Sequence, residues 1–390
     1  MTADSSLLTV GVPKETSCQE RRVALVPADV RSLKKAGFEV LVESSAGLPA
    51  GFLDAQYVQQ GARIAADRAE LASADVILHV RAGAADLEQP FAVGESLREN
   101  QILIAMCDPL SDPRPLAALA DRRVTTFALE LLPRITRAQS MDVLSSMATI
   151  AGYKAVLLAA AASPRMFPMM MTAAGTLTPA KVFVVGAGVA GLQAISTARR
   201  LGAIVYAYDV RPAAREQIQS VGGKPVDFGL ESAEGQGGYA RAMDQDYYKR
   251  QRAAMAKVVA ESDVVITTAA VPGKRAPILI TNDMLVGMSP GSIIVDLAAE
   301  RGGNCEATKA GETVEMGGAL VIGPVNLPAT VAHHASQMFS RNITAFLLLL
   351  KKSGLPALDM QDEIVRDTLI TRDGQVVNSQ IRERLTAPVS

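Results

Sequence analysis

The chain has 390 residues, 49% of them hydrophobic and 20% charged, and its formal net charge is −1. This composition is typical of a soluble globular protein, and the length favours two domains over one compact core. Because there is no excess of basic residues, nucleic acid is not expected as the main ligand.

The first third of the chain alternates strand-like runs with helical segments. An apolar run at residues 7–12 is followed by helical spacing at residues 27–35. Further runs rich in β-forming residues lie at 38–42, 75–80, 101–106 and 123–129. Such alternation predicts a parallel sheet covered by helices.

A second series of strands begins at Lys181, after a long helical segment. Residues 141–162 contain few helix breakers and predict a helix that leads out of the first domain. The expected strands of the second series are residues 182–185, 204–208, 264–267, 293–297 and 320–322. A second βαβ domain is therefore predicted.

The end of the chain is expected to return to the first domain. Residues 329–350 predict a second long helix, and Asp373-Gly374 centres a predicted hairpin at residues 368–377. We therefore assign residues 1–144 plus 331–390 to the first domain. Residues 145–330 form the second, nucleotide-binding domain.

The sequence patterns predict no signal peptide, no membrane-spanning helix and no metal site. Residues 1–9 lack a basic region followed by an apolar stretch. A spanning helix needs about 20 apolar residues, and the runs at 155–162 and 345–350 are shorter. Cys18, Cys107 and Cys305 show no CxxC spacing and no Cys/His cluster, so we expect free thiols and no metal.

A glycine-rich turn marks the expected cofactor site. Residues 182–185 are a buried-strand run, and Gly186, Gly188 and Gly191 follow in G-x-G-x-x-G spacing before a helical segment. Gly186 permits the turn, Gly188 lets a pyrophosphate approach the backbone, and Gly191 lets helix and strand pack closely. The helix N-terminus offers N–H donors to the phosphates. The fold class is thus α/β, with two Rossmann-like parallel-sheet domains separated by a cleft and joined by long helices.

The residue that ends the next strand bears on which dinucleotide binds. Asp209 lies 18 residues after Gly191, where a carboxylate accepts hydrogen bonds from the adenosine ribose and repels a 2′-phosphate. Arg211 complicates this interpretation, because an arginine near that position can serve a 2′-phosphate. We give more weight to Asp209, so NAD(H) is the expected cofactor.

The chain offers no conspicuous catalytic base. Dehydrogenases that act on alcohols or amines usually carry a histidine or lysine near the nicotinamide. Of the three histidines, His79 lies inside an apolar run, and His333 and His334 are adjacent on the predicted return helix. Hydride exchange between two nicotinamides needs no acid or base, but it requires two rings held face to face without water.

The segment Pro133–Ser146 is rich in groups that suit such a task. Gln139 and Asp142 are predicted to lie one turn apart on a helix, as are Asp142 and Ser145, and together they can hold a nicotinamide carboxamide. Arg134 is placed to pair with Asp142 and shape the loop. The alternative interpretation is a capped, solvated helix start.

With these motifs in place, the sequence resembles the NAD(H)-binding domain I of proton-translocating NAD(P) transhydrogenases, in the form of a separate alpha-1 subunit. The resemblance covers nearly the whole chain, and the run from Arg134 to Ser146 is highly specific. The matching segments are residues 11–15, 22–25, 133–146, 151–153, 167–175, 186–191, 237–240, 272–274, 296–298 and 302–305.

The resemblance implies a two-domain subunit, usually dimeric, on the cytoplasmic or matrix side of a membrane. Its partners are a membrane-spanning domain II and an NADP(H)-binding domain III. Hydride passes directly between NADH bound to this chain and NADP+ bound to domain III, and transfer is coupled to proton translocation through domain II.

Site residues carried over from the resemblance fall into two groups. The nicotinamide-side residues are Arg134, Gln139, Asp142 and Ser145. The cofactor-binding residues are Gly186, Gly188, Val189, Gly191, Asp209, Val210, Arg211, Gly238, Tyr239, Gln251 and Ala270. Tyr239 corresponds to the tip of a mobile loop that closes over the nucleotide.

Two other functions remain open from the sequence. Alanine dehydrogenase shares the architecture, and Arg22 fits its carboxylate-binding arginine. That family, however, needs a lysine where this chain reads His79-Val-Arg81 and a histidine where it reads Cys107-Asp-Pro. A nucleotide-sensing module without turnover is the third interpretation.

Overall fold

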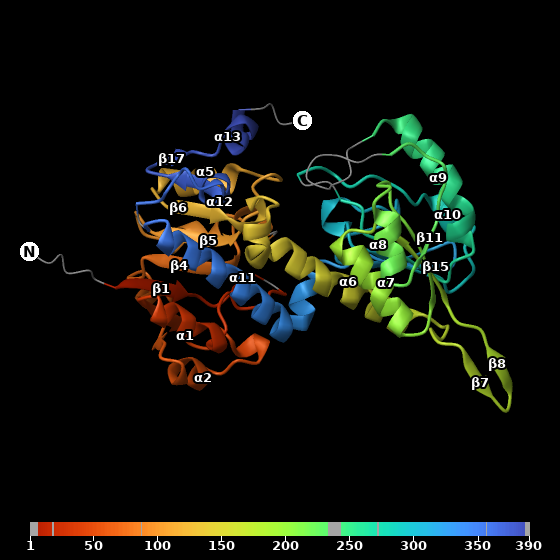
Figure 1. Ribbon diagram of the computed structural model, residues 1–390, viewed down its shortest axis with the longest axis horizontal. Helices are drawn as coiled ribbons and strands as arrows, with labels where there is room; N and C mark the ends of the chain where they lie inside the picture. The colour runs from red at the N-terminus through yellow and green to blue at the C-terminus, as the bar shows by residue number, and fades with distance from the viewer. Residues whose placement is uncertain are drawn as a thin grey trace, which may run out of the picture. The chain divides into compact units, whose positions relative to one another are not determined.

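The computed structural model describes residues 7–17, 19–86, 88–232, 243–270, 273–355 and 357–386. The chain divides into two compact units (Figure 1). Unit 1 comprises Met1–Met147 and Ala329–Ser390, and unit 2 comprises Ala148–Pro328. The sequence predicts domain boundaries after residues 144 and 330.

Unit 1 is built on an eight-stranded sheet in the order β17-β16-β6-β5-β4-β1-β2-β3. The six strands from β3 to β6 run parallel, and β16 and β17 form an antiparallel edge. Figure 1 shows β1, β4, β5 and β6 side by side. The strands are β1 Leu8–Val12, β2 Phe38–Glu43, β3 Arg63–Ala65, β4 Val76–Arg81, β5 Ile102–Met106, β6 Thr125–Ala128, β16 Leu369–Arg372 and β17 Gln375–Val376.

Helices cover this sheet, and the long return helix α11 is fastened to the start of the chain. The Ser336 and Ser340 hydroxyls of α11 each accept a backbone N–H, from Val23 and Val26 respectively, at 3.0 Å. These bonds satisfy buried donors in the loop before α1. The helices are α1 Pro27–Lys35, α2 Asp54–Gln59, α3 Arg68–Leu71, α4 Ala92–Glu95, α5 Arg114–Asp121, α11 Ala332–Lys352, α12 Glu363–Thr368 and α13 Ser379–Thr386.

Unit 2 holds a seven-stranded sheet in the order β11-β10-β9-β12-β13-β15-β14, parallel except for β14. The order reverses at β9, so the crevice at its carboxyl end is the place where such sheets bind ligands. The strands are β9 Lys181–Val185, β10 Ile204–Tyr208, β11 Lys224–Pro225, β12 Val264–Thr267, β13 Ile293–Asp296, β14 Thr313–Met316 and β15 Ala319–Ile322.

Both faces of the unit 2 sheet are buried. Val182 and Val184 of β9 pack in a core with α6, α7 and α8, whereas Phe183 and Val185 pack with α9 and α10 on the other face. This two-sided burial explains why the strands are continuous apolar runs rather than alternating ones. The helices are α6 Val143–Ala162, α7 Val189–Arg200, α8 Ala214–Ser220, α9 Gln245–Ala260 and α10 Asn282–Val286.

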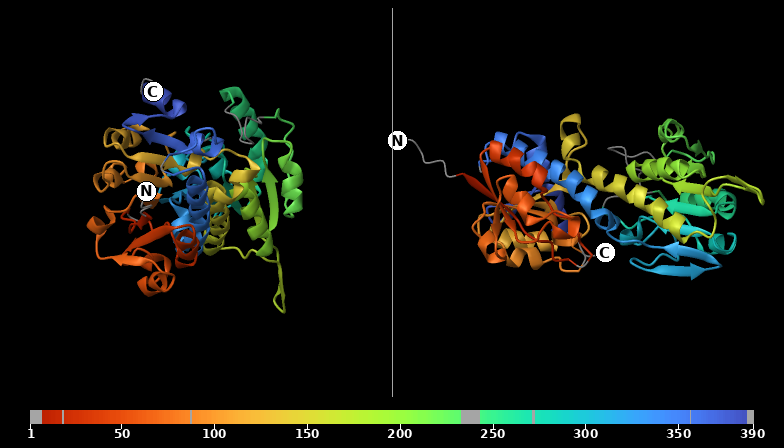
Figure 2. Two further views of the ribbon diagram at one scale, coloured as in Figure 1. Left: turned by 60° about the vertical axis from the view of Figure 1, so that its left-hand side comes forward. Right: turned by 90° about the horizontal axis from the view of Figure 1, so that it is seen from below.

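A small hairpin projects from the body of unit 2 in every view (Figure 2). It consists of β7 Met170–Thr172 and β8 Gly175–Leu177, paired antiparallel, and all six strand residues are exposed. Met171 is 78% exposed, and Met169 is 59% exposed. Exposed apolar side chains gathered in one place commonly mark a contact surface.

Helix α6 differs from what the sequence analysis expected. It is the one helix in the described segments of the chain that is long and apolar enough to cross a membrane, by length and composition. The core helix of a soluble protein passes the same test, and α6 contributes Ala155, Val156 and Ala159 to the unit 2 core. The sequence patterns did not predict a helix of this apolar length, because Ser145, Ser146 and Thr149 interrupt the apolar run without breaking the helix.

Most predicted elements agree with the structure. The helix predicted at residues 27–35 is α1, and the hairpin around Asp373-Gly374 is β16 and β17. The two described cysteines, Cys107 and Cys305, are buried free thiols, as expected. Cys18 lies outside the described residues.

Candidate nucleotide-binding site

The glycine motif forms a tight turn between β9 and α7. Gly186 has φ +100°, and a Cβ there would lie 2.4 Å from the Thr268 hydroxyl oxygen. A Cβ on Gly191 would lie 1.8 Å from the backbone oxygen of Gly186, so helix and turn pack in direct contact. At Gly188, by contrast, a Cβ would meet nothing within 4 Å. Space is thus left open at the one glycine that a pyrophosphate is expected to approach.

The N-terminus of α7 lies at this open position. Gly188 is the N-cap residue, and Val189 begins the helix with a side chain that is 42% exposed. The first N–H groups of a helix have no partner within the helix and carry its positive dipole end. Gly152 of α6 buttresses the turn, because a Cβ there would lie 2.1 Å from the Ala190 backbone oxygen.

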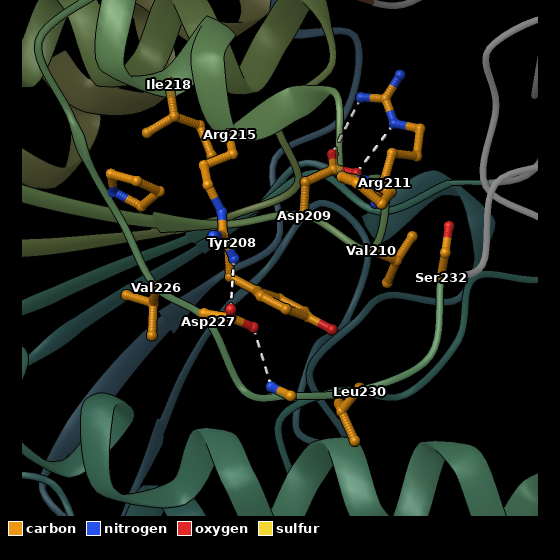
Figure 3. Close-up of a pocket in the computed structure, with 13 residues that line it drawn as sticks. Tyr208, Asp209, Val210, Arg211, Arg215, Ile218, Val226, Asp227, Leu230 and Ser232 are labelled. Atoms are coloured by element: carbon orange, nitrogen blue, oxygen red, sulfur yellow. Dashed lines mark hydrogen bonds and ion pairs between the residues drawn. The ribbon is translucent and has the colours of Figure 1, made fainter.

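Asp209 lies half-buried at the carboxyl end of β10 and already has several hydrogen-bond partners. Its Oδ2 accepts the Ala187 N–H at 2.7 Å, which ties the strand end to the glycine turn. The Arg211 guanidinium donates through Nε to Oδ1 at 2.9 Å and through Nη2 to Oδ2 at 3.0 Å (Figure 3). The side chains of Asp209 and Arg211 are 8% and 18% exposed. The arginine that complicated the sequence interpretation therefore neutralises the aspartate.

A cavity of about 390 Å³ opens beside this pair. That volume lies within the range of about 300–1,000 Å³ usual for small-molecule sites. Both arginines of the lining are paired with an aspartate, Arg211 with Asp209 and Arg215 with Asp227 (Figure 3). The lining residues are Tyr208, Asp209, Val210, Arg211, Pro212, Arg215, Ile218, Pro225, Val226, Asp227, Gly229, Leu230 and Ser232.

The cavity and turn together suit an adenosine with its phosphates. The Tyr208 ring packs against Phe228 with ring centroids 4.8 Å apart, and burial raises the pKa of its hydroxyl. An apolar wall of this kind accepts a base, the Asp209 carboxylate is placed to accept from ribose hydroxyls, and α7 can receive phosphate. The residues present therefore fit a dinucleotide.

Two further predicted cofactor residues are described. Gln251 of α9 is 2% exposed and donates to the Tyr208 hydroxyl at 3.4 Å. Its Oε1 has no hydrogen-bond partner among the described residues. Ala270 is exposed after β12, where Asn304 binds both backbone groups of Ala269. Gly238 and Tyr239 lie outside the described residues.

In unit 1, the predicted nicotinamide-side residues lie on one connection that follows β6. Arg134 and Gln139 are exposed, and Asp142 and Ser145 are half-buried. Gln139 lies in the 3₁₀ helix Thr136–Met141, and Asp142 has left the helical conformation with ψ 91°. The prediction that one helix carries Gln139 and Asp142 is therefore wrong, because the chain changes direction between the 3₁₀ helix and α6.

Asp142 caps α6 through Ser145. Its Oδ1 accepts the Ser145 N–H at 2.9 Å, and its Oδ2 accepts the Ser145 hydroxyl at 2.6 Å. A carboxylate at this position is stabilised by the helix dipole. The capped helix start that the sequence left open as an alternative is thus present, and it leaves the amide of Gln139 exposed ahead of it.

The positions where an acid or base was sought hold other contacts. His79 is 3% exposed, with Nδ1 3.1 Å from Glu15 Oε1. Cys107 is buried, and its pKa is raised by burial. His333 stacks on Phe52 with centroids 4.5 Å apart. No group of three or more potential metal ligands occurs in the described ranges.

Three residues that shape this connection were not signalled by the sequence patterns. The Glu130 carboxyl is buried, and its Oε1 accepts the Asp108 N–H at 2.8 Å. Asp362 pairs with Arg137, and Asn342 donates to the Ser140 carbonyl oxygen at 2.8 Å. Asp362 and Asn342 lie more than two hundred positions away in the chain, so no local pattern signals them.

Comparison with known proteins identifies the family. The model of the alanine dehydrogenase/PNT N-terminal domain matches residues 11–151, and that of the C-terminal domain matches residues 155–379. The chain belongs to the alanine dehydrogenase/PNT family. It is thus a member of an oxidoreductase family of Rossmann type that binds nicotinamide nucleotides.

Within the alanine dehydrogenase/PNT family, transhydrogenase subunits are similar over almost the whole chain. The first part of the NAD(P) transhydrogenase alpha subunit from Rhodospirillum rubrum is 44% identical over 383 residues, which cover 95% of this chain and 98% of that protein. The solved transhydrogenase structure from Sinorhizobium meliloti is 43% identical with a TM-score of 0.82, covering 95% of this chain and 99% of that one.

Alanine dehydrogenases are more distant in sequence but equally similar in fold. The enzyme of Methanococcus maripaludis is 27% identical, and the match covers 98% of this chain and 97% of that protein. A solved L-alanine dehydrogenase is 26% identical with a TM-score of 0.82, covering 97% of this chain and 99% of that one. Because the TM-scores are equal, the choice between the two activities depends on side chains.

Proposed function

We propose that this chain is the NAD(H)-binding subunit of a proton-translocating, Re/Si-specific NAD(P) transhydrogenase. The observation that carries the proposal is 44% identity over 95% of the chain with the corresponding transhydrogenase alpha subunit of Rhodospirillum rubrum. In the proposed reaction, hydride passes directly from NADH on this chain to NADP+ on a partner domain III. A membrane-spanning domain II couples this transfer to proton translocation.

The side chains at the ends of β4 and β5 favour this reaction over amino-acid oxidation. A dehydrogenase of the alanine type needs a lysine and a histidine there, and this chain has a buried His79 paired with Glu15 and a buried Cys107 thiol. Exchange between two nicotinamides moves no proton at carbon, so it needs positioning groups and no base. Addition of pyruvate and ammonium should therefore cause no loss of NADH.

In the proposed mechanism, this chain's residues bind, orient and exclude water. The Asp209 carboxylate accepts from the adenosine ribose, and the α7 N-terminus receives the pyrophosphate. Gln139, which lies with Arg134 on the nicotinamide side, would contact the nicotinamide carboxamide and fix the rotation of the ring, while Asp142 and Ser145 set where the connection ends. Bound NADH supplies the hydride.

We expect the isolated protein to bind NADH at least about tenfold more tightly than NADPH, which corresponds to about 1.4 kcal/mol. A 2′-phosphate would approach the Asp209 carboxylate, and both arginines of the cavity lining are paired with aspartates. Titration calorimetry with each nucleotide measures the ratio. Asp209→Ala releases Arg211 and should narrow the preference, whereas equal affinities in the unmodified protein would refute the role of Asp209.

The proposed reaction is tested by mixing this protein with purified domain III, NADH and an NADP+ analogue. We expect rapid hydride transfer, and Gln139→Asn should slow it by about tenfold or more with little change in NADH affinity. Shortening the side chain by one methylene moves the amide away from the ring. A misplacement of about 1 Å can lower the rate of a reaction about a hundredfold, even where the affinity for the ligand hardly changes.

A matched control for this test is Gln337→Asn, an amide shortened in the same way on α11. The Gln337 amide contacts His333 of the same helix at 3.4 Å. Its transfer rate should equal that of the unmodified protein. Transfer by Gln139→Asn at the normal rate in stopped-flow would remove Gln139 from the mechanism.

The assembly belongs to the same proposal. We infer a homodimer, because the exposed methionines of the β7–β8 hairpin offer an apolar surface that a second copy would cover. Sedimentation equilibrium measures the mass in solution and tests this directly. The proposed location is the cytoplasmic face of the membrane, where partner subunits hold the chain peripherally.

A further inference from the structure

The residue proposed to meet the nicotinamide lies on a short and weakly regular connection. Gln139 belongs to a six-residue 3₁₀ helix that is entered from an extended residue, Ile135, and left through Asp142. Helices of this kind have poor hydrogen-bond geometry and little intrinsic stability. A side chain on such a segment is positioned only as well as the contacts that anchor the segment.

Two anchors flank Gln139, and both come from the C-terminal segment of unit 1. Two residues before it, the Arg137 guanidinium donates to Asp362 through Nη1 at 2.6 Å and through Nη2 at 2.7 Å. One residue after it, the Ser140 carbonyl oxygen accepts from Asn342 of α11, which is 7% exposed. The backbone is therefore held on either side of the exposed amide.

Asp362 is itself fixed in place. Its side chain is 12% exposed, it caps α12 by accepting the Ile364 N–H at 2.9 Å, and its pair with Arg137 lowers its pKa. A paired carboxylate and guanidinium with two parallel bonds adopt one relative orientation. Because Asp362 caps α12, this pair fixes the position of Arg137 in the 3₁₀ helix relative to α12.

The pair contributes more to geometry than to stability. Arg137 is 52% exposed, and exposed ion pairs contribute only about 0–1 kcal/mol. The pair nevertheless joins the 3₁₀ helix to Asp362, the N-cap residue of α12, by two hydrogen bonds. Such a contact is suited to orientation of a functional side chain.

We propose that Arg137 and Asp362 are positioning residues that orient Gln139 for hydride transfer, with Asn342 as the second anchor. The catalytic meaning of this inference rests on the proposed function. Neither side chain touches the cofactor in the proposed mechanism. Both act through the backbone of residues 137–140.

The test variant is Asp362→Ser. Serine is as good an N-cap as aspartate, so α12 is retained, but the shorter neutral side chain cannot hold the guanidinium. Asp112→Ser is the matched control, because Asp112 forms the same two-bond pair with Arg114, at 2.8 and 2.6 Å, away from the connection. The exchanged pair, Arg137→Asp with Asp362→Arg, tests rescue.

We expect hydride transfer from NADH to an NADP+ analogue on added domain III to fall about tenfold in Asp362→Ser. The NADH dissociation constant and the urea midpoint should stay close to those of the unmodified protein. The exchanged pair should recover some of the lost rate, and Asp112→Ser should transfer normally. A normal rate in Asp362→Ser, or an equal loss in Asp112→Ser, would overturn the inference.

Hydrogen exchange separates this inference from the proposed function, because it needs no partner. The Ala138 and Asp142 amides of the isolated protein bond within the 3₁₀ helix, to the Ile135 and Gln139 carbonyl oxygens. These two amides should exchange faster in Asp362→Ser than in the unmodified protein. Their exchange rates should be unchanged in Asp112→Ser. If the unmodified protein transfers no hydride, the proposed function fails, and exchange alone decides the anchoring. Unchanged exchange in Asp362→Ser means that the pair does not anchor Gln139.

Discussion

Gly191→Ala should destabilise the protein by about 3 kcal/mol or more and abolish NADH binding. The new Cβ would lie 1.8 Å from the Gly186 backbone oxygen and 2.8 Å from its carbonyl carbon. Overpacking by one methyl group costs about 1–3 kcal/mol even where side chains can yield. Here the obstacle is backbone, so α7 must move away from β9 and carry the phosphate-binding N–H groups with it. Urea unfolding and titration calorimetry measure the two losses.

Gly188→Ala is the matched control, because it makes the same chemical change three residues earlier. Its φ is −73°, and a Cβ there would meet no atom within 4 Å. We expect stability to fall by no more than about 1 kcal/mol, the usual cost of alanine at an N-cap. NADH binding should still weaken, because the methyl group occupies the approach to the pyrophosphate. Equal destabilisation by the two variants would contradict this account of the turn.

Glu130→Gln should remove the part of the pH dependence of protein stability between about pH 5 and 7 that Glu130 causes. Burial, the largest cause, raises the pKa of Glu130 to about 7 from 4.5, although the backbone N–H groups of Cys107 and Asp108 oppose the rise. Oε2 is buried without a hydrogen-bond partner among the described residues. The protonated carboxyl is therefore favoured in the folded state.

The sign of the effect follows from proton binding. Between pH 4.5 and about 7 the folded protein holds a proton on Glu130 that the unfolded chain has released. The contribution of Glu130 to stability is therefore complete below pH 4.5 and is lost as the pH rises through about 7. At one pKa unit per 1.36 kcal/mol, this loss is about 3 kcal/mol. Glutamine mimics the neutral acid at every pH.

Urea unfolding of both proteins at pH 5 and pH 8 tests this prediction. The two should have similar stability at pH 5, and Glu130→Gln should be the more stable at pH 8 by about 2–3 kcal/mol. Glu99→Gln makes the same change at a side chain that is 56% exposed and should follow the unmodified protein. Parallel curves for Glu130→Gln and the unmodified protein would show that Glu130 is ionised in both states.

The elements that agree with the sequence predictions are those specified by local chemistry. Helix α1 begins at Pro27, whose fixed φ suits the first turn, and its apolar residues recur with helical spacing. Residues 182–185 of β9 are all apolar because both faces of the sheet are covered. The glycine spacing after β9 is recognisable because Gly191 contacts the backbone of Gly186, five residues before it in the chain.

The predicted site residues have contacts that their positions in the sequence do not reveal. The sequence predicts that the Asp209 carboxylate accepts hydrogen bonds from a ribose. In the structure this carboxylate already accepts hydrogen bonds from Ala187 and Arg211. The sequence left open that Arg211 binds a 2′-phosphate. In the structure Arg211 pairs with Asp209 instead, beside the cavity. Gln139 and Asp142 looked like neighbours on one helix, because helical spacing does not reveal a change of direction between two short elements.

The sequence by itself determined the α/β class, the glycine turn and the chemical identity of the connection after β6. These depend on periodicity, on backbone freedom at glycine and on residue type, which are all properties of short segments. Only the tertiary structure decided how that connection is held. The Arg137–Asp362 pair joins residues 225 positions apart, and the Glu130 carboxyl accepts the N–H of Asp108, which lies 22 positions before it. The Arg137–Asp362 pair forms only when α12 returns to unit 1, and the Glu130–Asp108 contact forms only when β5 and β6 lie side by side, so patterns within a short segment predict neither.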